Sequence, residues 1–120
     1  MAHRRIRTHL IRASALVMGA TVLAAPIAQA DAVAYLVNVT LRPGYHFAGP
    51  DAALAYGNGI CHKLSQGRTY GELMADVKSD FRTTDEFQAS YLIEQAANEL
   101  CPASITALRN SAGGYRLPTP

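Results

Sequence analysis

The chain contains two cysteines, Cys61 and Cys101, and this pair limits its possible folds more than any other feature. A disulfide between them would close a loop of about 40 residues, which disfavours the unfolded chain by roughly 4 kcal/mol in the chain-entropy model. Such a cross-link forms and persists in oxidising compartments. The role of Cys61, as half of a structural disulfide or as a reactive thiol, therefore depends on whether the chain is exported.

The N-terminal residues have the three parts of a secretory signal peptide in the right order. Four arginines lie ahead of a 13-residue apolar run from Ala13 to Ala25, and Ala28 and Ala30 then supply the small side chains that a signal peptidase accepts. The apolar run is shorter than the roughly 20 residues of a membrane-spanning helix. We therefore predict that residues 1–30 are a signal peptide, cleaved after Ala30 on the general secretory route.

Cleavage changes the charge of the protein. The whole chain has a formal net charge of +2, but residues 31–120 hold seven Lys/Arg and nine Asp/Glu, a net charge of −2. Nucleic-acid binding depends on clustered basic residues, so we expect no nucleic-acid partner. We also expect no stable membrane span after cleavage. The partner would be an envelope or extracellular protein or an apolar small molecule, and the protein would be secreted or held in the periplasm or cell envelope.

The residues after the signal peptide show helical periodicity and no convincing strand alternation. We predict an all-α fold, a small bundle of four to five short helices stapled by one disulfide. The bundle would be one domain, residues 31–110, and "SAGGYRLPTP" (111–120) is typical of a flexible tail. The expected helices cover residues 31–41, 50–67, 69–81, 83–101 and 102–110.

Local signals predict where these helices begin and which face of each points inward. Asp31 is a good N-cap, Pro50 suits a first helical turn, and Thr69 and Thr83 each precede a glutamate by three residues, the pattern of a capping box. Gly57 would allow close packing of the second helix. The expected inward stripes are Val33, Leu36, Val37 and Leu41 in the first helix and Phe87, Tyr91, Ala96 and Leu100 in the fourth.

Several of these positions resemble a known family, the small secreted actinobacterial, largely mycobacterial proteins with domain of unknown function 732. The resemblance covers residues 31–104 and implies a compact helical domain with one disulfide, exported to the envelope or the medium. It implies no activity, and we expect no cofactor. The matching residues are Gly57, Ile60, Cys61, Leu64, Gly67, Ala96, Cys101 and Pro102.

Cys61 and His62 are neighbours in sequence, which argues against a catalytic pair. Adjacent side chains on a helix point about 100° apart, whereas a thiolate needs its base within hydrogen-bond reach. The mature chain offers two cysteines and two histidines without paired spacing, so we expect no metal site. We predict a disulfide between Cys61 and Cys101, no catalytic residue and a non-enzymatic binding module. The alternative is a small secreted hydrolase that uses carboxylate or histidine chemistry.

The segment "GYHF" places Tyr45, His46 and Phe47 in the loop between the first two expected helices. Prolines and glycines on both sides argue against a regular element there. The two aromatic rings would either fold back as a lid on the core or line a recognition surface, with His46 as a polar contact. These three residues are the predicted partner contacts.

Overall fold

The computed structural model describes residue 19 and residues 27–119. Residues 1–18 and 20–26, most of the predicted signal peptide, lie outside the described residues. Within the described part the chain forms helices and no strand, which confirms the all-α prediction. The elements are α1 (Ile27–Leu41), α2 (Pro50–Ser65), α3 (Tyr70–Asp80), α4 (Glu86–Gln95), the π-helical turn η1 (Ala96–Leu100), the 3-10 turn η2 (Pro102–Ser104) and α5 (Ile105–Ala112).

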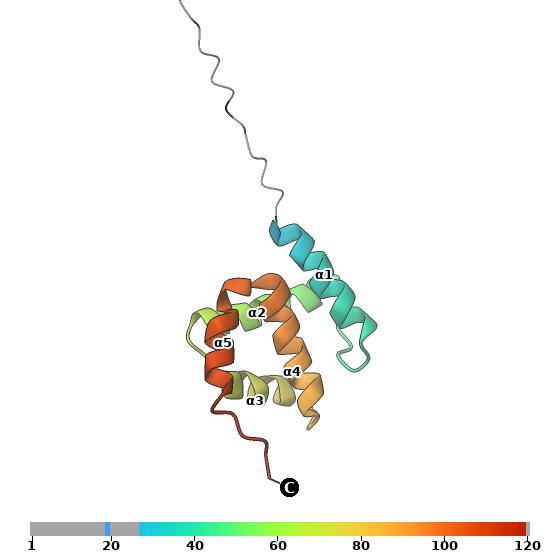
Figure 1. The fold of residues 1–120 in the computed structure, drawn as a ribbon. Helices are drawn as coiled ribbons and strands as arrows, with labels where there is room; N and C mark the ends of the chain where they lie inside the picture. The colour runs from blue at the N-terminus through green and yellow to red at the C-terminus, as the bar shows by residue number, and fades with distance from the viewer. Residues whose placement is uncertain (1–18, 20–26, 120) are drawn as a thin grey trace, which may run out of the picture.

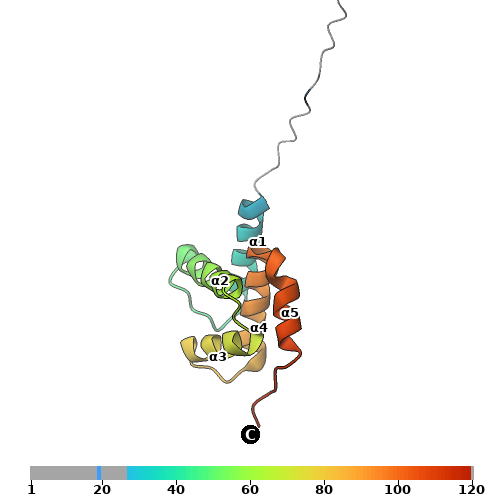
Figure 2. The ribbon, with the colours of Figure 1, turned by 90° about the vertical axis from the view of Figure 1, so that its left-hand side faces the viewer.

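The helices pack around one core, with the two ends of the described chain far apart (Figures 1 and 2). α1 packs against α2, α4 and η1, and α3 packs against α4 and α5. In both views the first turns of α1 extend beyond the other helices, and the segment after α5 leaves at the opposite end. The fully buried core side chains include Tyr35, Val39, Leu73, Met74, Val77, Leu92 and Ile93.

The predicted disulfide between Cys61 and Cys101 is present, with Cα atoms 5.9 Å apart. It joins the C-terminal half of α2 to the residue that follows η1. In η1 the helix widens, and the amide of Cys101 donates to the carbonyl of Ala96, five residues earlier. The cross-link therefore fixes the point where α4 and η1 end and the chain turns towards α5.

Two predicted helix starts are confirmed. Pro50 occupies the first turn of α2, where its missing N–H costs nothing. Thr69 caps α3 through a full capping box: its hydroxyl accepts from the amide of Glu72, and the Glu72 carboxylate accepts from the amide of Thr69. Both helix starts could be predicted because their signals are local. Pro50 acts through its own backbone, and Thr69 and Glu72 lie within one turn.

Two other predicted caps are wrong. α1 begins at Ile27, four residues before the expected cap Asp31, so Asp31 lies inside the helix. α4 is capped by Asp85, whose carboxylate accepts from the amides at 87 and 88. The hydroxyl of Thr83 instead accepts from the amide of Asp85, so it positions the cap residue rather than the helix.

The predicted inward stripe of α1 is also wrong for three of its four residues. Val33, Val37 and Leu41 are 57%, 49% and 79% exposed. Tyr35 and Val39 face the core instead, and the Tyr35 hydroxyl donates to the carbonyl of Ala53 at 3.0 Å. α1 is apolar on two faces, and the core takes the face with the larger side chain.

Gly57 explains how Tyr35 fits between the helices. A Cβ atom at Gly57 would lie 2.6 Å from Cζ of Tyr35 and 2.7 Å from Cδ1 of Leu100. The missing side chain therefore lets α2 approach both α1 and η1, as the sequence predicted.

The stripe predicted for α4 and η1 is partly wrong, since Phe87 is 60% exposed. Tyr91 and Leu100 are half-buried, and Ala96 is buried as predicted. The inner face of α4 consists of Ala89, Leu92 and Ile93. Capping at Asp85 leaves Phe87 in the first turn, where its ring lies over the outer surface.

Candidate binding surface

The loop between α1 and α2, residues 42–49, carries the three predicted contact residues. Tyr45 and Phe47 face the core, whereas His46 faces solvent. Tyr45 is 4% exposed, and its hydroxyl donates to the carbonyl of Gln88 at 2.6 Å. Its ring packs edge-on against Phe81 at 5.4 Å. Tyr45 therefore belongs to the core, and burial raises its pKa to about 12.

Phe47 and His46 differ from Tyr45 in exposure. Phe47 is half-buried, and its ring lies 5.7 Å from that of Phe81 and 5.9 Å from that of Tyr56. His46 is exposed and has a left-handed backbone, with φ of 51°. Both aromatic rings thus form a lid on the core, while the imidazole remains accessible to a partner.

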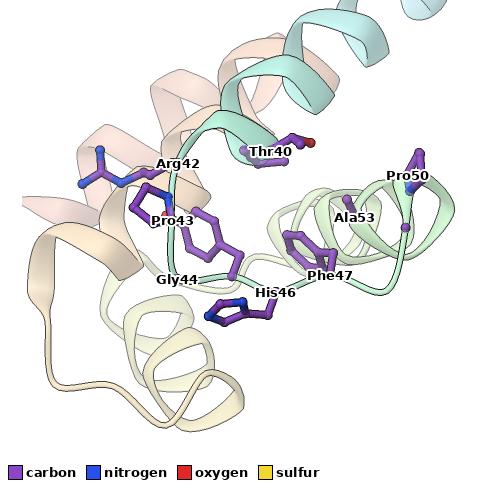
Figure 3. A pocket seen from close by; sticks show the side chains of 11 residues that line it. Thr40, Arg42, Pro43, Gly44, His46, Phe47, Pro50 and Ala53 are labelled. Atoms are coloured by element: carbon purple, nitrogen blue, oxygen red, sulfur yellow. The ribbon is translucent and has the colours of Figure 1, made fainter.

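A pocket of about 290 Å³ lies inside this loop (Figure 3). The end of α1 contributes Thr40 and the start of α2 contributes Pro50 and Ala53. Figure 3 shows Thr40 on one side and Phe47 on the other, with the Arg42 guanidinium pointing away. All three predicted contact residues line this loop pocket.

The outer side of α1 adds a second, shallower hollow of about 270 Å³. It is lined by Leu36, Val37, Leu41, Thr40 and Pro50, and the last two residues also line the loop pocket. The hollows therefore adjoin. We call the exposed residues Val33, Val37 and Leu41 together with the loop pocket the α1–loop surface.

Arg42 is one of the residues that line the loop pocket, although its guanidinium points away from it (Figure 3). Its guanidinium carbon lies 4.3 Å from the ring centre of Phe87 and 4.4 Å from that of Tyr91. A guanidinium held between two rings gains cation–π attraction on both sides. Phe87 itself stays 60% exposed.

Cys61 and His62, the pair considered for catalysis, do not line the loop pocket. Cys61 is in the disulfide, and His62 is exposed on α2. Among residues 27–119 no three His, Cys, Asp or Glu side chains gather where a metal ion could bind. In the same part of the chain no helix has the length and apolarity needed to cross a membrane.

The sequence identified part of this surface and missed the rest. The lack of polar residues in the loop singled out Tyr45, His46 and Phe47, and all three line the pocket. The sequence predicts Val37 and Leu41 in the core, whereas the structure exposes both. The signal that could have separated them is Tyr35, the largest side chain of α1, which lies on the opposite face.

Comparison with known proteins gives a family match. A family model described as "Protein of unknown function (DUF732)" matches residues 29–103, the part of the chain from α1 to η2. No curated protein and no solved structure matches.

Proposed function

The chain belongs to this family of unknown function, and we propose that it is a non-enzymatic binding module that takes an apolar ligand on the α1–loop surface. The observation that carries the proposal is the exposure of Val33, Val37 and Leu41 on a regular helix beside a pocket. Contiguous exposed apolar side chains cost hydration free energy and often mark binding sites. The alternative remains a small secreted hydrolase that uses carboxylate or histidine chemistry.

The size of the surface favours a small ligand over a protein partner. The three exposed side chains of α1 offer on the order of 200 Å² of apolar area. A stable protein–protein interface buries about 800 Å² on each partner. The two adjoining hollows, of about 290 and 270 Å³, together fall within the size range of small-molecule sites.

The chemistry of the lining favours an uncharged hydrocarbon group. Leu36, Val37, Leu41 and Pro50 supply apolar walls, and Thr40 supplies a hydroxyl where the two hollows meet. The nearest cation, Arg42, is already stacked on two rings. A linear alkyl chain could lie along α1 and place its end in the loop pocket.

Export belongs to the same proposal. The disulfide is compatible with an oxidising compartment, and the family resemblance implies a secreted or cell-envelope protein of actinobacterial, largely mycobacterial origin. Apolar ligands in such a setting would be envelope lipids or molecules that cross the envelope. Cleavage after Ala30 would leave the whole α1–loop surface in the mature protein.

Titration with the neutral fluorescent probe Nile red tests the proposal. The double variant Val37→Ser, Leu41→Ser should bind the probe about tenfold more weakly than wild type, since two apolar contacts are lost. Leu117→Ser is the matched control, because Leu117 is 69% exposed but lies near the C-terminus. The control should bind like wild type. Equal binding by the double variant and wild type would refute the proposal.

A further inference from the structure

A cavity of about 370 Å³ lies between α5 and the stretch formed by α4 and η1. α5 runs beside α4 (Figures 1 and 2), but it packs mainly against η2 and α3. At the α3 end, the amide of Tyr70 donates to the hydroxyl of Ser111 at 2.9 Å. α5 is therefore held at both ends, and the cavity lies along the side that faces α4.

The apolar lining of this cavity, which we call the α4–α5 cavity, comes mostly from α5. Leu108 is buried, and Ile105 and Ala112 are half-buried. Positions three and four residues apart lie on one side of a helix, so these three side chains form one apolar wall. The ring of Tyr70, also half-buried, adds to this wall from the start of α3. The wall is suited to an aliphatic group.

Two opposite charges line the cavity, one from each of the two helices beside it. Glu94 belongs to α4 and Arg109 to α5, and both side chains are exposed. Within residues 27–119, neither forms an ion pair with the other or with a third residue. The carboxylate is thus available to the ammonium group of a ligand and the guanidinium to its carboxylate. Both contacts are charge-assisted hydrogen bonds, which are the stronger kind.

An uncharged polar group, the side-chain amide of Asn98, lines the same cavity. Asn98 belongs to the π-helical turn η1, and wider turns of this kind recur at functional sites. Its amide can both donate and accept hydrogen bonds. Burial raises the pKa of Tyr70, and the carboxylate of Glu94 raises it further, which places that carboxylate near the tyrosine hydroxyl. Charged, amide and aromatic groups therefore share one concave site.

We propose that the α4–α5 cavity binds a small zwitterion with an aliphatic part, which is the chemistry of an aliphatic amino acid or of a short peptide with free termini. The ammonium group pairs with Glu94, the carboxylate pairs with Arg109, and the aliphatic part lies on the wall around Leu108. The volume is within the range of small-molecule sites. The cavity shares no lining residue with the two hollows of the α1–loop surface, so the two sites can be tested independently.

The test is an NMR titration of the oxidised full chain with two probes, L-leucine and the dipeptide leucyl-leucine. At least one probe should give saturable amide shifts at Glu94, Asn98 and Arg109, and the tighter of the two shows whether an amino acid or a peptide fits. Glycine and glycylglycine lack the aliphatic part and should bind about tenfold more weakly. Saturation by neither probe, or equal binding of the glycine counterparts, would overturn the proposal.

Derivatives of the tighter probe that lack one charge show which residue pairs with which group. The C-terminal amide lacks the carboxylate and the N-acetyl derivative lacks the ammonium group, so each should bind about fivefold more weakly, the effect of one exposed ion pair. Arg109→Gln should remove the difference between the probe and its amide, and Glu94→Gln should remove the difference between the probe and its acetyl derivative. Differences that persist in both variants would refute the pairing.

Arg116→Gln is the matched control, because Arg116 is exposed and does not line the cavity. It changes the net charge as Arg109→Gln does, yet it should bind all three ligands like wild type. A poorly folded variant would weaken all three ligands alike and would keep the differences between them. An effect of Arg116→Gln as large as that of Arg109→Gln would show that net charge alone matters and would overturn the proposal.

Discussion

α1 exposes three large apolar side chains on a regular helix, whereas the irregular segment after α5 holds Tyr115 against three other residues. Apolarity alone would predict that the α1 side chains are buried and that the segment after α5 is exposed. α1 has two apolar faces and the core accepts one, Tyr35 and Val39. Tyr115 combines a ring with a hydroxyl and meets a ring and a carboxylate. Burial therefore depends on a complementary surface being present.

The largest expected effect comes from the cross-link that holds both regions to the same core. Replacing Cys61 and Cys101 together by serine should lower the free energy of unfolding by about 4 kcal/mol, because the unfolded chain gains the freedom of a 40-residue loop. Urea denaturation measures this, and wild type reduced with dithiothreitol is the control. A variant as stable as oxidised wild type would show that packing alone holds the two regions.

The contrast between the two faces of α1 predicts the next effect. Tyr35→Ala should cost roughly 3 to 5 kcal/mol of stability, since a buried aromatic is truncated and the carbonyl of Ala53 loses its donor. Val37→Ser should change stability by less than about 0.5 kcal/mol. Thermal and urea unfolding of both variants measure the difference. A large loss from Val37→Ser would place the outer face in the stable core and break the comparison.

Alkaline pH should sharpen the contrast between a buried and a less buried tyrosine. Burial raises the pKa of Tyr45 to about 12, against about 10 in the unfolded chain. Its contribution to stability is complete below pH 10 and is lost as the pH rises through 12. The pKa of Tyr115 is also raised, again by burial. Urea unfolding of wild type and Tyr45→Phe between pH 8 and 12 tests this, and identical profiles would contradict it.

The smallest effect concerns the hydroxyl of Tyr115. Tyr115→Phe should lower stability by about 1 kcal/mol, the usual net value of one hydrogen bond, because its partner Glu86 keeps Lys78. Differential scanning calorimetry measures the shift in melting temperature. No shift would favour the sequence prediction of a flexible tail over residues 111–120.

Much of the fold could be predicted because its signals are local or covalent. Thr69 with Glu72 fixes the start of α3 within one turn, and Cys61 with Cys101 has no competing partner. The faces of α1 and α4 could not be predicted in the same way. Val37 and Phe87 fit a helical stripe, but which stripe faces inward depends on elements far away in sequence.

The candidate surface was predictable in part for the same reason. Tyr45 and Phe47 stand out in a loop with few polar residues, and their rings do pack on the core. The exposed side of α1 follows only from three-dimensional competition, in which Tyr35 fits beside Gly57 and excludes Val37 from the core. A single sequence does not report that competition.

The most direct test of the binding surface is NMR mapping of the oxidised mature protein with octyl glucoside, below its critical micelle concentration, as a neutral alkyl probe. The account predicts amide shifts confined to residues 33–54, the exposed side of α1, the loop and the first turn of α2. The shifts should disappear in Val37→Ser, Leu41→Ser. Shifts centred on α3 and α5, or unchanged shifts in that variant, would contradict the account.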